Sequence, residues 1–96
     1  MRVDKYLKVS RLVKRRTVAK ELADAGRVEL NGRTAKAGSE LLVGDRLKIL
    51  RYGGRNREIE VLALAESIRA DEAASLYRLI SEERLMQEDD FFNLPL

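Results

Sequence analysis

A chain of 96 residues, with 45% apolar side chains and a formal net charge of +3, is long enough for one small folded domain with a modest core. The sequence has no apolar run of the roughly 20 residues needed to cross a membrane, and its basic start is not followed by the apolar segment of a signal peptide. It contains no histidine and no cysteine. We therefore do not expect an enzyme, a metal site or a cofactor. The lack of cysteine also leads us to expect a cytoplasmic protein.

The charge is divided unevenly along the chain. Residues 1–57 carry 16 Lys and Arg against 6 Asp and Glu, a net charge of +10, whereas residues 58–96 carry 3 against 10, a net charge of −7. A basic first half predicts a polyanionic partner, and the acidic second half would orient the encounter. The alternative is a solvated basic surface without a partner.

The first helix is expected over residues 3–9. Three apolar residues share one side of it: Val3, Tyr6 and Leu7. Asp4 lies in its first turn, where a carboxylate stabilises the helix dipole by roughly 0.3–1 kcal/mol. Alternatively, Asp4 pairs with Arg2 or Arg16 and directs a guanidinium toward RNA, or it accepts a ribose hydroxyl or a base amine directly.

Residues 10–14 are expected to connect this helix to a second one over residues 15–25, which Gly26 ends. The apolar face of the second helix contains Val18, Ala19, Leu22, Ala23 and Ala25. Arg16 and Lys20 lie near its start, where cations gain nothing from the helix dipole. Because phosphate is attracted both to a helix N-terminus and to cations, this arrangement indicates an anionic partner.

Alternating apolar and polar residues then predict a sheet. Strands are expected over residues 27–30, 33–37, 46–50 and 57–64, with a loop over 38–42. Asn31-Gly32 is typical of a tight hairpin turn, and Gly53-Gly54 permits another. The residues expected to face inward are Val28, Leu30, Leu47, Ile49, Ile59 and Val61. The predicted fold is α+β, with a basic helix pair packed on a small, twisted, mostly antiparallel sheet.

A third helix is expected over residues 70–86, because apolar residues recur at helical spacing and Asp71 and Glu72 suit its start. We divide the chain into an RNA-binding core at 1–50, a sheet extension and C-terminal helix at 51–86 that complete the same domain, and an acidic, flexible tail at 87–96. The alternative for this tail is a short motif that docks Phe91, Phe92 and Leu94 on a partner or back on the domain.

Three segments together resemble a known module. RVDKYL at residues 2–7, RRTVAKELADAGRVELNG at 15–32 and VGDRLKI at 43–49 are similar to the RNA-binding domain named after small-subunit ribosomal protein S-four. A closer resemblance, to the stand-alone bacterial RqcP (YabO-like) family, extends to about residue 85 through DEAASLYRLISEERL. The tail lies outside this resemblance.

The RqcP resemblance implies an RNA-binding factor of ribosome quality control. Members of the family bind large ribosomal subunits obstructed by peptidyl-tRNA, contact both rRNA and tRNA, and work with RqcH while untemplated alanines are added to the stalled chain. The implied role is mechanical, and the implied protein is a ribosome-associated monomer in the cytoplasm. The implied functional residues are Arg2, Asp4 and Arg16, with Lys8, Lys14, Arg15 and Lys20 in support.

The basic stretch as a whole gives the candidate RNA-binding set: Arg2, Asp4, Lys5, Lys8, Arg11, Lys14, Arg15, Arg16 and Lys20. RNA helices are recognised mainly through phosphates and ribose hydroxyls, for which arginine and lysine are suited. Neutralising about six phosphates predicts a log-log salt slope on the order of −4 to −5. The alternatives are a heat-shock-type S-four protein that rescues free large subunits, a DNA-binding basic protein, and a detached RNA-targeting module of a modification enzyme.

Overall fold

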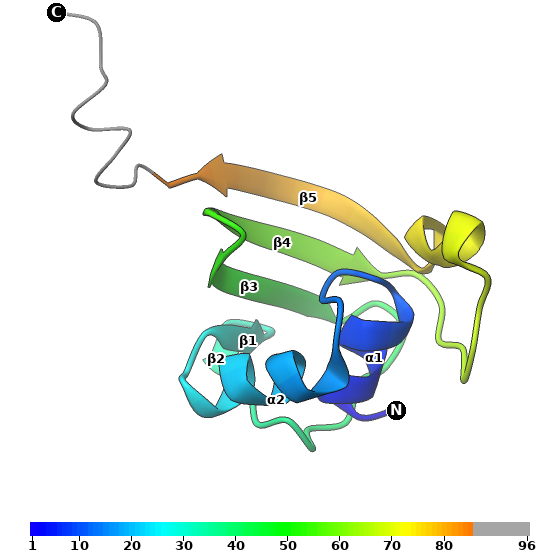
Figure 1. Ribbon diagram of the computed structural model, residues 1–96, viewed down its shortest axis with the longest axis horizontal. Coiled ribbons are helices and arrows are strands. Elements are labelled where there is room, and N and C mark those ends of the chain that lie inside the picture. Colours follow the sequence, from blue (N-terminus) through cyan, green and yellow to red (C-terminus); the bar gives the residue numbers. More distant parts are fainter. Residues whose placement is uncertain (86–96) are drawn as a thin grey trace, which may run out of the picture.

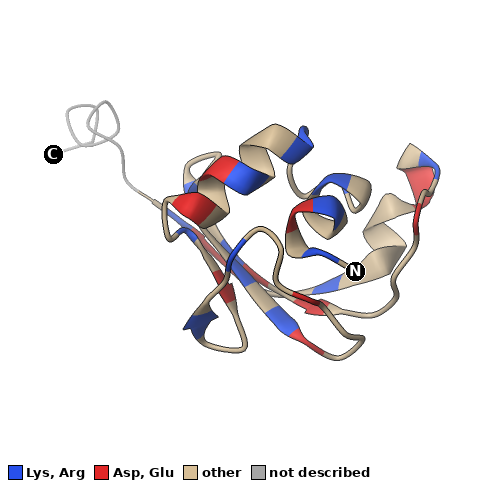
Figure 2. Cartoon of the chain, turned by 90° about the horizontal axis from the view of Figure 1, so that it is seen from below, with Lys and Arg blue, Asp and Glu red and all other residues tan. Residues whose placement is uncertain are grey.

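Two short helices packed on a five-stranded antiparallel sheet make up the fold (Figure 1). The computed structural model describes residues 1–85. Its elements are α1 (Val3–Val9), α2 (Arg16–Asp24), β1 (Val28–Leu30), β2 (Arg33–Thr34), β3 (Arg46–Tyr52), β4 (Arg55–Val61), the 3-10 helix η1 (Ala70–Leu76) and β5 (Tyr77–Arg84). The strand order is β2-β1-β3-β4-β5. Both α-helices lie on the same side of the sheet (Figure 2), which confirms the α+β fold class.

Helix α1 begins and ends where the sequence predicts. Its first amides are bound by the loop that precedes β3, because Val3 N donates to Ser39 O at 2.9 Å and Asp4 N to Ala37 O at 3.1 Å. At its other end, Arg11 adopts a left-handed backbone with φ of 64°. This turn leads into the connection over residues 10–14, and the loop anchors the basic start of the chain to the sheet.

Helix α2 is confirmed to within one residue at each end. Gly26 follows it with φ of 73°, and Arg27 N donates to Leu22 O at 2.9 Å. Such a left-handed glycine satisfies the last carbonyls of a helix. Ala25, expected on the apolar face, is exposed, because it is the C-cap residue and lies beyond the last packed turn.

The hairpin predicted at Asn31-Gly32 joins β1 to β2, with φ values of 52° and 85°. The Asn31 side chain fixes the turn against β3, since its Oδ1 accepts a hydrogen bond from Arg46 N at 2.9 Å. Strand β2 is only two residues long instead of the expected 33–37. The chain leaves the sheet there because Ala37 O is needed at the start of α1.

The core lies between the helix pair and the sheet. Its fully buried members include Val3, Tyr6, Leu7, Val13, Val28, Leu41, Leu47, Ile49, Ile59 and Val61. All the strand residues expected to face inward are buried except Leu30, which is half-buried. The alternation therefore predicted the strand residues of the core, whereas Val13 and Leu41, which lie outside the helices and strands, were not predicted.

The expected helix over residues 70–86 is wrong beyond Leu76. The structure has η1 over Ala70–Leu76 and then strand β5, which pairs along the whole length of β4. The helical spacing of its apolar residues is a local signal, and pairing with the open edge of β4 overrides it. Residue 86 and the tail predicted at 87–96 lie outside the described residues. Within residues 1–85, no helix has the length and apolar character required to cross a membrane.

Candidate nucleic-acid interface

A single buried carboxylate joins the two basic helices. Asp4 is 3% exposed and lies in the first turn of α1. Its Oδ1 accepts hydrogen bonds from Arg2 Nε at 3.1 Å and from Lys5 N at 2.8 Å. Its Oδ2 accepts from Arg2 Nη2 at 3.3 Å and from Arg16 Nε at 3.2 Å. Asp4 therefore fixes the arginine that precedes α1 relative to the arginine that begins α2.

The two arginines remain accessible although they share this carboxylate. Their side chains are 50% and 48% exposed for Arg2 and Arg16, whereas that of Asp4 is 5% exposed. Burial raises the pKa of Asp4, but hydrogen bonds from Arg2 and Arg16 and the charge of Arg16 bring its pKa below the ordinary value of 3.8. The ionised carboxylate, whose oxygens are occupied, matches the hypothesis that Asp4 orients guanidiniums and does not itself contact RNA.

Arg2 is also held by the loop before β3. Its backbone forms an antiparallel bridge with Glu40. A Cβ atom placed on Gly38 would lie 3.6 Å from Arg2 Cζ, so the guanidinium rests against the glycine backbone. The hydrogen bond to Asp4, followed by the charge of Asp4, raises the pKa of Arg2 above its ordinary value. Helix α1, through Asp4, and the loop before β3 thus determine the direction of this side chain.

Four more residues of the predicted set lie on the same two helices or on the connection between them: Lys8, Lys14, Arg15 and Lys20. All four are exposed, and within residues 1–85 their side chains have no hydrogen bond or ion pair. Lys14 and Arg15 directly precede α2, a helix without a side-chain N-cap. Because a helix N-terminus attracts anions, these two cations and the helix end favour the same kind of ligand.

Lys5 and Arg11, which the sequence places in the same set, make internal contacts instead. Lys5 forms an ion pair with Glu66, and the hydrogen bond from Lys5 lowers the pKa of that carboxyl group. The Arg11 guanidinium donates to Val9 O at 2.8 Å and to Ile68 O at 3.2 Å. These side chains fasten the segment between β4 and η1 to α1, so we leave both residues out of the proposed interface.

One supporting residue was not predicted from the sequence. Arg57 on β4 donates from Nη2 to Leu12 O at 3.3 Å, and so holds the connection that carries Lys14 and Arg15. The two residues are 45 positions apart. No local pattern indicates such a contact, because it depends on how the sheet packs against the helix pair.

Cations on the later strands are compensated by acids. Arg78 contacts Glu60 at 2.5 Å and Arg55 contacts Glu82 at 2.7 Å. Blue and red segments are intermixed along the strands in Figure 2, which also shows Lys and Arg on both helices. The uncompensated positive charge of residues 1–85 therefore belongs to the first half of the chain, as the charge division predicts.

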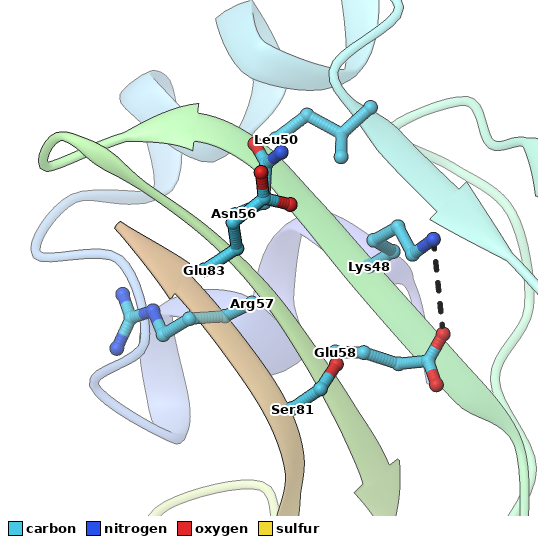
Figure 3. Close-up of a pocket in the computed structure, with 7 residues that line it drawn as sticks. All are labelled: Lys48, Leu50, Asn56, Arg57, Glu58, Ser81 and Glu83. Carbon is cyan, nitrogen blue, oxygen red and sulfur yellow. Dashed lines mark ion pairs between the residues drawn. The ribbon is translucent and has the colours of Figure 1, made fainter. Parts of the chain in front are cut away.

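A shallow depression on the face of the sheet opposite the helices offers no comparable site (Figure 3). It encloses about 100 Å³ and is lined by Lys48, Leu50, Asn56, Arg57, Glu58, Ser81 and Glu83. Lys48 already contacts Glu58 at 4.0 Å, and the guanidinium of Arg57 is directed away to Leu12 O. Within the described residues, no group of three His, Cys, Asp or Glu could hold a metal ion.

Comparison with known proteins gives a consistent result. The family model of the S4 domain matches residues 1–47. The chain is 49% identical over 85 residues to the RQC P-site tRNA stabilizing factor of Streptococcus pneumoniae, covering 88% of this chain and 96% of that protein. It is 48% identical to the factor of the same name from Bacillus subtilis, covering 98% of it. The trimeric structure of Vibrio cholerae Heat Shock Protein 15 superposes with a TM-score of 0.78 at 32% identity, covering 84% of this chain and 82% of that one.

Proposed function

Since the chain belongs to the S4 domain family, and within it to the RQC P-site tRNA stabilizing factors, we propose that it is an RNA-binding factor of ribosome quality control. It binds ribosomal RNA and tRNA on large subunits obstructed by peptidyl-tRNA. In the finer form of the proposal, it works with RqcH and supports the addition of untemplated alanines to the stalled chain. It acts in the cytoplasm on the ribosome, as a monomer.

The observation that carries the proposal is the carboxylate shared by two arginines. Asp4 holds the Arg2 and Arg16 side chains in place while leaving about half of each exposed. Arginines fixed in this way can each offer two donors to a phosphate without first losing side-chain freedom. The four uncompensated cations of the helix pair extend this surface and suit the phosphates of a folded RNA.

The proposed mechanism is positioning without any chemical step. The helix pair binds RNA backbone, and the sheet keeps the two helices at a fixed angle. A rigid surface of this kind can hold a tRNA in its ribosomal site between rounds of elongation, because it lowers the free energy of the bound arrangement. The described residues supply cations and hydrogen-bond donors for this task, and the role requires no nucleophile or general base.

Substitution of Arg16 tests the proposal directly. Arg16→Ala should reduce co-sedimentation with large subunits that carry peptidyl-tRNA, while Arg2 still satisfies Asp4 and the melting temperature falls by only a few degrees. Arg78→Ala is the matched control, since Arg78 is also exposed but is paired with Glu60 on the sheet. If Arg16→Ala co-sediments as well as wild type, Arg16 has no part in binding.

The heat-shock-type role is the second candidate, and the superposition on Vibrio cholerae Heat Shock Protein 15 favours it. Deletion of the gene separates the two roles, because only loss of the proposed factor should abolish alanine tails on stalled chains. Competition with duplex DNA at physiological salt tests the remaining DNA-binding alternative. Equal affinity for DNA and structured RNA would favour that alternative. Light scattering of the purified protein tests the monomeric state.

A further inference from the structure

Four cations outside the predicted set also have side chains without a partner within residues 1–85: Arg27, Arg33, Lys36 and Arg51. Two of them, Arg27 and Arg51, are close along the backbone, where the chain enters β1 beside the end of β3. Leu50 N donates to Arg27 O at 2.8 Å, so the backbone of Arg27 lies beside that of Leu50 and Arg51. Arg51 is exposed and Arg27 is half-buried. No function assigned above uses either residue.

The backbone at Arg51 is strained. Its φ is 52°, in the left-handed region that side chains other than glycine rarely adopt. Ile49 pairs with Arg57 and Tyr52 pairs with Arg55, so β3 contains one extra residue in this interval. The Asn56 side chain fixes this bulge by accepting a hydrogen bond from Arg51 N at 2.9 Å. Bulges of this kind redirect a side chain and are enriched near functional sites.

The other two non-glycine residues with positive φ in residues 1–85 have structural explanations. Asn31 occupies the hairpin turn for which such an angle is required. Arg11 uses its angle to bring its guanidinium to the last carbonyls of α1. Arg51 occupies the bulge beside the Gly53-Gly54 turn, where Asn56 holds its backbone, but within the described part of the chain its side chain has no comparable contact.

This pair lies away from the Asp4 centre. Arg16 begins α2 and Arg27 follows its end, and the nine residues of α2 span about 13 Å at 1.5 Å per residue. Figure 1 shows the turn between β3 and β4 toward the left of the view, whereas the N-terminus lies to the right, beside α1. The two places are therefore separated by the length of α2.

We propose that Arg27 and Arg51 form a second phosphate-binding surface, which holds a different segment of RNA backbone from the one bound by the helix pair. The inference rests on the proposed function. RNA fits better than a protein partner, because protein interfaces have an apolar centre. The large hydrophobic residues exposed within residues 1–85 are elsewhere: Leu42, Val43, Leu62 and Leu79.

The test compares the salt dependence of binding for two RNAs, bare tRNA and large subunits stripped of tRNA. Arg27→Ala/Arg51→Ala should reduce the magnitude of the log-log salt slope by about 2 for one of them. Lys14→Ala/Arg15→Ala should do so for the other, and Arg78→Ala should change neither. Unchanged slopes for the first double variant, or an effect of both double variants on the same RNA only, would overturn the inference.

Arg51→Gly separates binding from folding. Glycine adopts this backbone angle without strain, so the variant should keep or raise the melting temperature while reducing the slope by about 1. A lower melting temperature would show that Arg51 serves stability, and the inference would fail. If wild type binds neither RNA in a salt-dependent manner, the proposed function fails as well. If wild type binds and the arginine variants match it, only the second surface is refuted.

Discussion

Replacing Asp4 by asparagine removes one charge at the centre of the proposed interface and keeps the shape of the side chain. The amide oxygen can still accept the two hydrogen bonds that Oδ1 accepts, from Arg2 Nε and from Lys5 N. The amide nitrogen replaces Oδ2 and is a donor, so it faces two further donors, Arg2 Nη2 and Arg16 Nε. Two of the four hydrogen bonds to this side chain are therefore lost.

The expected cost follows from where these groups lie. A hydrogen bond to a charged group contributes about 1.5–3 kcal/mol when it is well buried, and an exposed ion pair about 0.2–1 kcal/mol. The carboxylate is buried but the guanidiniums are half exposed, so solvent screens part of the interaction. We expect Asp4→Asn to lose about 1–2 kcal/mol of the free energy of unfolding at pH 7. For a domain of this size each kcal/mol lowers the melting temperature by about 4–8 °C.

The assay is urea unfolding of wild type and variant at several pH values. The pKa of Asp4 is lower in the folded protein than its ordinary value of 3.8. The carboxylate therefore contributes stability that is fully present above pH 3.8 and is lost as the pH falls through the folded pKa. The difference between wild type and Asp4→Asn should be constant near neutral pH and should shrink in acid.

Two results would refute the reasoning. Equal stability at pH 7 would mean that the carboxylate does not hold the arginines in solution. A difference that persists undiminished well below pH 3.8 would mean that the loss comes from packing and not from charge. In parallel, Asp4→Asn should weaken large-subunit binding more than Lys8→Ala does, because it releases the Arg16 side chain and leaves Arg2 with one of its two hydrogen bonds to this residue, whereas Lys8→Ala removes one mobile charge.

The remaining predictions concern the support of this surface. Leu22→Ala truncates a core side chain that is 6% exposed and should lose roughly 2–5 kcal/mol in urea unfolding; unchanged stability would mean that the register of α2 is wrong. Tyr6→Phe removes a 2.7 Å hydrogen bond to Leu76 O, but that carbonyl still accepts from Leu62 N and Ala63 N, so the loss should be only about 1 kcal/mol; a loss above 3 kcal/mol would contradict this account. Arg11→Ala should also lower the free energy of unfolding, by about 1 kcal/mol. It should leave the salt slope of RNA binding unchanged, because the guanidinium binds backbone carbonyls. A reduced slope would mean that Arg11 belongs to the RNA interface.

The parts of the fold that local signals determine could be predicted. Helices α1 and α2 and the Asn31-Gly32 hairpin depend on apolar spacing and on glycine positions, which the sequence displays directly. Strand β5 could not be predicted, because its apolar residues also suit a helix and only the unpaired edge of β4 decides between the two. Local pattern and tertiary pairing disagree there, and pairing determines the outcome.

The same distinction applies to the interface. The pairing of Asp4 with Arg2 or Arg16 was among the predicted alternatives, because a single acid within a basic stretch is expected to pair with one of the cations around it. The internal roles of Lys5 and Arg11 could not be predicted, since their partners are 61 and 57 residues away. Nor does the sequence show that Arg51 adopts a left-handed backbone, because arginine is not a residue type that marks a bulge, here near the end of β3.

The hydroxyl of Tyr6 reaches a carbonyl that is 70 residues further along the chain. Along with Lys5 and Arg11, it ties the first helix to residues that a ribosome synthesises much later. A nascent or truncated chain that ends near residue 50 contains the whole recognisable RNA-binding sequence, yet its first helix lacks these tethers and its third strand has an open edge. We therefore expect competence for RNA to appear late in synthesis, when η1 and β5 close the fold, and not when the basic residues themselves emerge.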